Sequence, residues 1–240
     1  MYEGTDTARE QRNQAQAPFR AAVFDLDGTM VDNMPWHTQA FDAFVSRYGL
    51  PPITLETRRR IDGKRNREIF PLLFDREMTL DEVRAFEEEK EGAYRELSKG
   101  QLAPLAGLVH LLDRLEAHRV PVAIATSAPR ENVVHTLEEI GLTARLTTIV
   151  RGDEVAHGKP EPDVFLLAAE RLGVAPGACV AFEDAPLGVT AAVRAGMRAV
   201  ALTTTFTREA FEGSSTPPHA IYRDFDDYLA GEGRGLVAAV

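Results

Sequence analysis

The sequence predicts an α/β protein: a doubly wound parallel sheet with an all-helical cap domain inserted after the first strand. Three observations support this prediction. Short, almost continuously apolar runs alternate with stretches of helical periodicity, which is typical of parallel strands covered by helices on both faces. Residues 36–99 interrupt this alternation with helical patterns alone. Prolines and a glycine mark the two ends of the interruption.

The core elements follow from the apolar pattern. The first apolar run, at residues 19–24, predicts a buried strand that opens into the loop at 25–29. Similar runs predict further strands at 120–125, 146–150, 179–182 and 198–202. Helical periodicity between these runs predicts helices at 106–118, 130–140, 163–172 and 187–195.

The insert and the ends complete the domain organisation. Helical periodicity in the insert predicts helices at 36–48, 54–60, 66–75 and 79–98. Pro35 precedes the insert, and Gly100 with Pro104 closes it. We therefore expect a core domain at 18–35 and 100–240, a cap domain at 36–99, and a tail at 1–17 that is flexible or forms a short frayed helix.

Composition excludes several classes of function. The 240 residues include 27 Lys and Arg against 37 Asp and Glu, a net charge of −10, which argues against nucleic acid and membranes as partners. No run approaches about 18 apolar residues, and the N-terminus lacks the apolar segment of a secretory signal. The single Cys179 favours a reducing compartment. We expect a cytoplasmic protein that is a monomer or a weak homodimer.

Two carboxylates, Asp25 and Asp27, follow the first predicted strand. In an open parallel sheet, ligands bind beyond the carboxyl ends of the strands. Carboxylates two residues apart on a strand point to the same face, so their charges crowd together. A cation that prefers oxygen ligands relieves this repulsion, and Mg²⁺ fits that requirement. Gly28 allows a tight turn away from the site.

Polar residues follow the later strands as well: Thr126-Ser127, then Lys159-Pro160, then Glu183-Asp184. Each segment alone has an ordinary interpretation as a turn, a solvated loop or a helix cap. Together with the Asp25-Leu-Asp-Gly-Thr segment, their order and spacing over residues 19–205 resemble the four motifs of the haloacid dehalogenase superfamily. The surrounding residues are similar to the branch that contains β-phosphoglucomutase and phosphatases of small metabolites.

The resemblance implies a Rossmann-like core that performs Mg²⁺-dependent phosphoryl transfer. Asp25 would attack phosphorus and carry the phosphoryl group, and Asp27 would protonate the leaving oxygen and then deprotonate the acceptor. Thr126 and Lys159 would contact the phosphoryl oxygens. The implied metal ligands are Asp25, Asp27 through its backbone carbonyl, and Asp184. Glu183 would act through a water molecule or by contacting the ligands rather than the metal.

Cationic residues of the cap are candidates for binding the substrate. The segment 58–67 carries six cations and one anion, which indicates either a solvated surface or an anion-attracting loop. Lys90 and His37 match a lysine and a histidine of the sugar-phosphate mutases, although His37 also fits a structural role. The expected substrate-binding residues are His37, Lys64, Arg65, Arg67, Lys90, Ser127 and Arg130.

The sequence departs from the mutase pattern where the mutases hold a second phosphate. An arginine of that family corresponds to Asn66 here, and a Ser-Lys pair corresponds to Ala128-Pro129. Arg65, Arg67 or Arg130 would have to substitute for them. We therefore expect a phosphatase that acts on a small phosphorylated metabolite such as a sugar phosphate. One alternative is a phosphomutase of β-phosphoglucomutase type. The other is a non-catalytic phosphate-responsive module, and the chain length, Asp27 and the cap argue against this second alternative.

Overall fold

The computed structural model describes residues 19–237, so the expected tail at 1–17 lies outside the described residues. One sheet contains six parallel strands in the order β3-β2-β1-β4-β5-β6. They are β1 (Ala21–Phe24), β2 (Val122–Thr126), β3 (Ile149–Arg151), β4 (Cys179–Glu183), β5 (Arg198–Leu202) and β6 (Ala220–Tyr222). The predicted parallel sheet is confirmed. Within the described range, no helix is both long and apolar enough to cross a membrane.

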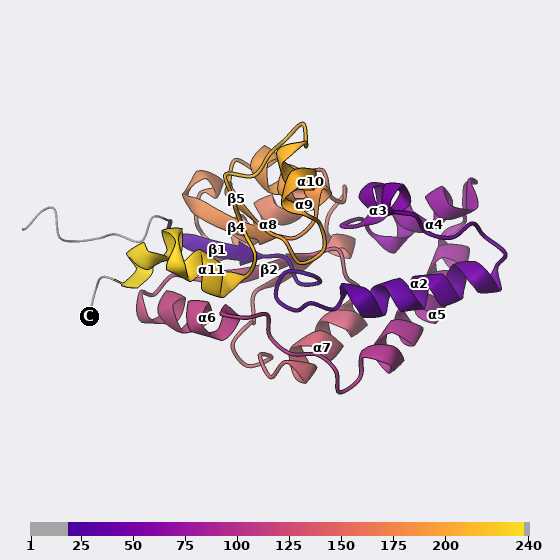
Figure 1. Cartoon of the computed structure of the whole chain (residues 1–240), viewed down its shortest axis with the longest axis horizontal. Helices are drawn as coiled ribbons and strands as arrows, with labels where there is room; N and C mark the ends of the chain where they lie inside the picture. The colour runs from indigo at the N-terminus through magenta and orange to yellow at the C-terminus, as the bar shows by residue number, and fades with distance from the viewer. Residues whose placement is uncertain (1–18, 238–240) are drawn as a thin grey trace, which may run out of the picture.

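Both faces of the sheet are buried under helices, as the apolar runs predict. Ala22 and Phe24 of β1 lie in one apolar layer, and Ala21 and Val23 lie in the other. The first layer is covered by α6 (Leu108–Ala117), α7 (Arg130–Glu139) and α11 (Phe225–Ala230), and the second by α8 (Asp163–Leu172), α9 (Pro186–Arg194) and α10 (Arg208–Glu212). Figure 1 shows α6 and α11 on one side of the sheet, with α8 and α9 on the other.

The insert forms a helical cap beyond one end of the sheet (Figure 1). Its helices are α2 (Met34–Arg47), α3 (Leu55–Ile61), α4 (Asn66–Phe74) and α5 (Leu80–Ser98). They share an apolar core of their own, made by Phe41, Phe44, Val45, Ile61, Ile69, Phe70 and Val83. Pro35 lies in the first turn of α2, where a missing N–H costs no hydrogen bond, so the helix begins earlier than predicted.

Some short elements escape the sequence pattern. The prediction contained neither β6, whose three side chains are only half-buried, nor the short helices α10 and α11. The strand predicted from residue 146 begins at Ile149, because pairing with β2 starts there. Short 3₁₀ segments lie at η1 (Gly152–Glu154), η2 (Pro176–Ala178) and η3 (Glu232–Val237).

The strand order determines where a ligand can bind. Phe24, the last residue of β1, pairs with Ile124 of β2 on one side and Phe182 of β4 on the other. The chain runs from β1 outward through β2 and β3, then returns to the other side of β1 for β4. The crevice at such a reversal of strand order is the usual ligand site of open parallel sheets. The residues that follow these three strands therefore lie together.

Candidate active site

Three buried carboxylates meet at the carboxyl ends of β1 and β4. Asp25 follows β1, Glu183 ends β4, and Asp184 comes next. A carboxylate oxygen from each lies within 4.8 Å of one from each of the others. All three residues are buried, with at most 6% of their surface exposed. Such a concentration of acidic groups requires compensating positive charge.

Lys159 supplies one positive charge. It reaches the cluster from the loop between β3 and α8, and its Nζ lies 2.5 Å from Asp25 Oδ1 and 2.6 Å from Glu183 Oε1. The other Glu183 oxygen accepts hydrogen bonds from the backbone N–H groups of Asp184 and Ala185, at 3.0 and 3.1 Å. Because protein donors engage both of its oxygens, Glu183 is suited to an indirect role beside a metal.

One lysine does not neutralise three carboxylates, and the pKa values of the cluster reflect the excess. Burial, opposed by Lys159 and reinforced by Glu183, raises the pKa of Asp25 to about 8. Burial and the charges of Glu183 and Asp25 raise the pKa of Asp184 well above its ordinary value. A divalent cation relieves this repulsion, and a donor set made only of carboxylate oxygens suits Mg²⁺. The residues present therefore fit the metal that the sequence predicts.

The neighbouring loops hold Asp184 in place. Thr29 Oγ1 donates a hydrogen bond of 3.3 Å to Asp184 Oδ1, and Thr205 Oγ1 donates one to Asp184 Oδ2. Gly28, with φ of +79°, turns the chain directly over this carboxylate. A Cβ at Gly28 would overlap Asp184, so both the backbone conformation and the close approach require glycine.

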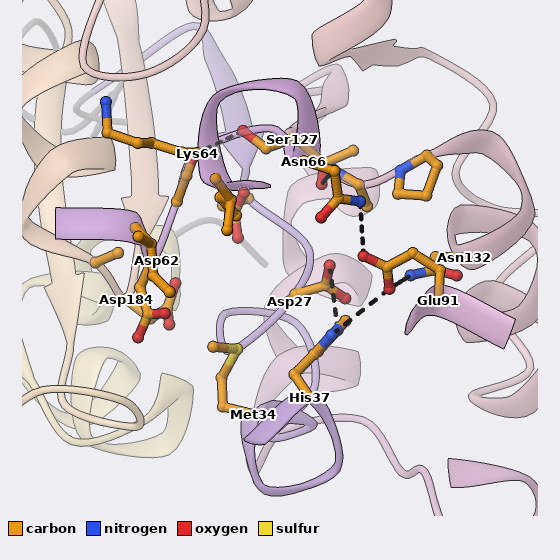
Figure 2. A pocket seen from close by; sticks show the side chains of 18 of the residues that line it. Asp27, Met34, His37, Asp62, Lys64, Asn66, Glu91, Ser127, Asn132 and Asp184 are labelled. Carbon is orange, nitrogen blue, oxygen red and sulfur yellow. Dashed lines mark hydrogen bonds and ion pairs between the residues drawn. The ribbon is translucent and has the colours of Figure 1, made fainter. Parts of the chain in front are cut away.

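Asp27 differs from the expectation that it shares a strand face with Asp25. Strand β1 ends at Phe24, so both residues lie in the following loop, and Asp27 turns towards the cap (Figure 2). Asn33 Nδ2 donates a hydrogen bond of 2.6 Å to Asp27 Oδ1, and His37 Nε2 lies 3.8 Å from Asp27 Oδ2. Burial alone raises the pKa of Asp27, but His37 and Asn33 together bring it below its ordinary value.

Thr126 and Ser127 lie beside this cluster, at the end of β2. Thr126 Oγ1 accepts a hydrogen bond of 3.0 Å from the N–H group of Ala128 and is left with its own proton to donate. Ser127 Oγ instead donates to the Gly63 carbonyl of the cap, at 2.7 Å. Thr126, which we expect to contact the phosphoryl oxygens, therefore lines the site. The hydroxyl of Ser127 instead joins the core to the cap.

A cavity lies between the strand ends and the cap. Asp25, Asp27, Thr126, Glu183 and Asp184 line it from the core. Of the cap residues expected to bind substrate, His37, Lys64 and Lys90 line it as well. His37 Nε2 is buried there without a hydrogen-bond partner among the described residues, so it remains available to a ligand oxygen.

Among the residues of the cavity wall that were not predicted from the sequence are Glu91 and Asn132. Glu91 adjoins Lys90 on α5, and Asn132 comes from α7 of the core. Figure 2 shows Asn132, Glu91 and Asn66 grouped on one side of the cavity. The sequence signal for Glu91 was its place beside Lys90 on a face of α5 that also carries Val83 and Tyr94. Both Val83 and Tyr94 are buried, which indicates that this face is covered.

Three arginines expected to bind substrate lie elsewhere. Arg65 is buried, and its Nη1 donates to the carbonyls of Gly152 at 2.9 Å and Val155 at 3.1 Å, so its guanidinium ties the cap to the core. Arg67 is exposed and donates to the carbonyl of Ala156 at 2.9 Å. Arg130, at the start of α7, is exposed, and none of the three lines the cavity. The structure therefore does not bring these three arginines to the cavity.

Arg65→Ala is expected to destabilise the protein, because the buried carbonyls of the core lose their donor. We expect the free energy of unfolding to fall by about 1–3 kcal/mol, measured by urea denaturation. Arg67→Ala is the matched control, since Arg67 reaches the same core segment from an exposed position, and its effect should stay within about 0.5 kcal/mol. Equal effects of the two variants would contradict this account of Arg65.

The fold and the acidic site at its strand ends define an α/β protein with a candidate metal site, and comparison with known proteins gives its family. The sequence profile of the haloacid dehalogenase-like hydrolases matches residues 22–202, and the chain belongs to this family. The resemblance and enzyme class predicted from the sequence are thereby confirmed.

Similar proteins include phosphatases of sugar phosphates. The chain is 34% identical to the phosphorylated carbohydrates phosphatase of Thermotoga maritima over 75% of this chain and 83% of that protein. It is 33% identical to fructose-1-phosphate phosphatase YqaB of Escherichia coli, over 76% of this chain and 95% of that protein. The crystal structure of β-phosphoglucomutase from Clostridium difficile has the same fold, with a TM-score of 0.77, 20% identity and coverage of 92% of this chain and 100% of that one.

Proposed function

We propose that the protein is a Mg²⁺-dependent phosphatase of small phosphorylated sugars that works through an aspartyl-phosphate on Asp25. The observation that carries this proposal is the ion pair of Asp25 with Lys159, at the core side of a cavity that the cap covers. The Asp25 carboxylate supplies a nucleophile for phosphorus, and the Lys159 ammonium supplies charge for the phosphoryl oxygens. The similarity to two sugar-phosphate phosphatases supports the substrate class.

Asp25 and Asp184, together with the backbone carbonyl of Asp27, would hold the metal ion. When bound, Mg²⁺ supplies positive charge that keeps the carboxylates ionised and offsets the charge of the phosphoryl group. Glu183 would hold Lys159 in position, because its Oε1 lies 2.6 Å from the ammonium.

Asp27 would move the proton in both half-reactions. It faces the cavity beside His37 and lies two residues from the nucleophile. Its low pKa keeps it ionised in the free protein, so protonation requires the negative charge that a phosphate ester brings. It would then protonate the leaving oxygen and, as a base, deprotonate the water that attacks the aspartyl-phosphate. Thr126 would donate a hydrogen bond to the phosphoryl group.

The alternative function, a sugar phosphomutase, requires a second anion site in the same cavity. Asn66, Ala128 and Pro129 line the cavity at the positions where the mutases bind that phosphate. The arginines that would substitute for them lie outside the cavity. Each missing charge-assisted hydrogen bond costs on the order of 1.5–3 kcal/mol, or roughly ten- to a hundred-fold in binding. Water is therefore the favoured acceptor.

Parallel product assays on β-glucose 1-phosphate and other sugar monophosphates distinguish the two functions. We expect inorganic phosphate and free sugar in equal amounts with Mg²⁺, and no release after EDTA treatment until Mg²⁺ is restored. A coupled dehydrogenase monitors glucose 6-phosphate in the same samples. Formation of glucose 6-phosphate faster than phosphate, with dependence on glucose 1,6-bisphosphate, would establish the mutase instead.

A further inference from the structure

The cap side of the cavity carries a buried ion pair within a group of amides. We call Asn66, Lys90, Glu91 and Asn132 the polar wall; all four line the cavity and are buried. Figure 2 shows Asn66, Glu91 and Asn132 across the cavity from Asp184. The polar wall therefore faces the part of a substrate that lies beyond the transferring phosphate.

Hydrogen bonds fix the orientation of this wall. Glu91 Oε1 accepts from Asn66 Nδ2 at 2.8 Å, and Glu91 Oε2 accepts from Asn132 Nδ2 at 2.7 Å. Arg95 Nη1 donates to Asn132 Oδ1 at 2.8 Å, which fixes the orientation of that amide. The bond to Glu91 uses Nδ2 of Asn66 and leaves Oδ1 of the same amide as an acceptor for a ligand hydroxyl.

The positive charge of the polar wall is already engaged. Lys90 Nζ lies 3.0 Å from Glu91 Oε1 and 2.9 Å from His37 Nδ1, and Lys90 is 2% exposed. Burial on its own raises the pKa of Glu91, but Lys90, His37 and the two amides together lower it, so the carboxylate is ionised at neutral pH. The pair is then neutral as a whole. A second phosphate beside it would lose its hydration without gaining a free cation.

Two other lysines lie near the cavity, and neither supplies a free positive charge in the polar wall. Lys159 is paired with Asp25 and Glu183 on the core side. Within the described range, Lys64 is the cavity-lining lysine without a carboxylate partner; it is half-buried and lies in the loop between α3 and α4, two residues before Asn66. Figure 2 shows its amino group directed away from Glu91.

We propose that the polar wall selects phosphate monoesters whose remaining part is uncharged and rich in hydroxyl groups, and that it rejects substrates with a second anionic group. This inference rests on the proposed function and narrows its substrate class. A hydroxyl group of the substrate can donate a hydrogen bond to Asn66. A second phosphate or a carboxylate would instead lie beside the Lys90–Glu91 ion pair, which has no net charge. Sites built to hydrogen-bond a hydroxyl discriminate strongly between such ligands.

The test compares fructose 1-phosphate with fructose 1,6-bisphosphate, which differ in the second anion, on the wild-type protein with Mg²⁺. We expect kcat/KM for phosphate release to be at least about tenfold lower for the bisphosphate. Equal or higher efficiency with the bisphosphate overturns the inference. A preference for the bisphosphate that disappears in Lys64→Met would locate the second anion at Lys64 and would overturn it as well.

A charge-removing variant tests the role of Glu91 directly. In Glu91→Gln, Lys90 loses its carboxylate partner and becomes available to an anion, so the bisphosphate-to-monophosphate ratio of kcat/KM should rise at least about tenfold. Glu88→Gln is the matched control, because Glu88 is an exposed residue of the same helix and should leave the ratio unchanged. An unchanged ratio in a folded Glu91→Gln protein overturns the inference.

The outcomes also separate this inference from the proposed function. If Glu91→Gln fails to fold, the comparison of the two substrates on the wild-type protein still decides the inference. Release of phosphate from both fructose phosphates with equal efficiency overturns only the selectivity. Absence of release from every phosphate ester, p-nitrophenyl phosphate included, overturns the proposed function and the inference together.

Discussion

Asp25→Asn is expected to lower phosphate release by at least about 10³-fold, because an amide cannot form the acyl phosphate that carries the reaction. The fold should survive. Burial, opposed by Lys159 and reinforced by Glu183, raises the pKa of Asp25 to about 8, and Lys159 keeps Glu183 as its partner when Asp25 is replaced by a neutral residue. A neutral isostere removes part of the repulsion with Glu183, so the melting temperature should remain the same or rise.

Phosphate release from p-nitrophenyl phosphate and thermal unfolding measure these two effects. Asp42→Asn is the matched control, since Asp42 is an exposed aspartate of α2 and should retain full activity. More than about a tenth of wild-type activity in Asp25→Asn would contradict nucleophilic catalysis by this residue.

Lys159→Met is expected to lower both activity and stability. Lys159 is 1% exposed and is bonded to Asp25 and Glu183, so its loss leaves buried carboxylates without a cation. Removing one partner of a buried ion pair costs about 3–5 kcal/mol of unfolding free energy. Loss of the charge that faces the phosphoryl oxygens should lower kcat by about 10²–10³-fold.

Urea denaturation in EDTA and steady-state kinetics in Mg²⁺ report the two losses separately. Lys99→Met serves as the control, because Lys99 is exposed and should change stability by less than about 0.5 kcal/mol. If Lys159→Met kept wild-type kcat, the proposed contact of Lys159 with the phosphoryl group would be wrong.

The sequence alone predicted the fully buried elements, because their apolar residues follow one another along the chain. Strand β1 is apolar throughout because helices cover both faces of the sheet, so its pattern predicts its position. The residues after β1, β2 and β4 converge because parallel strands end at the same edge. Strand β6 escaped prediction since three half-buried residues carry little pattern.

The cap side of the site was harder to predict, because its contacts join distant parts of the chain. Arg65 is a cation in a basic segment and so resembles an anion-binding residue, yet its guanidinium donates to Glu68 and to backbone carbonyls at 152–156. Bonds to backbone carbonyls leave no pattern of side chains in the sequence. Glu91 looks like one more charge of an acidic helix until Asn132, from a different domain, is placed against it. Charge patterns identify candidate ligands, but burial and backbone partners decide which of them reach the cavity.

Transfer of the phosphoryl group through Asp25 can be observed in the variant Asp27→Asn. p-Nitrophenolate leaves without a proton, so Asp27→Asn should still form the aspartyl-phosphate from p-nitrophenyl phosphate while lacking the base that activates water. We expect a burst of one p-nitrophenolate per protein, and acid quenching followed by mass spectrometry should locate one phosphoryl group on Asp25. Turnover without a burst, or a phosphoryl group on any other residue, would contradict the account.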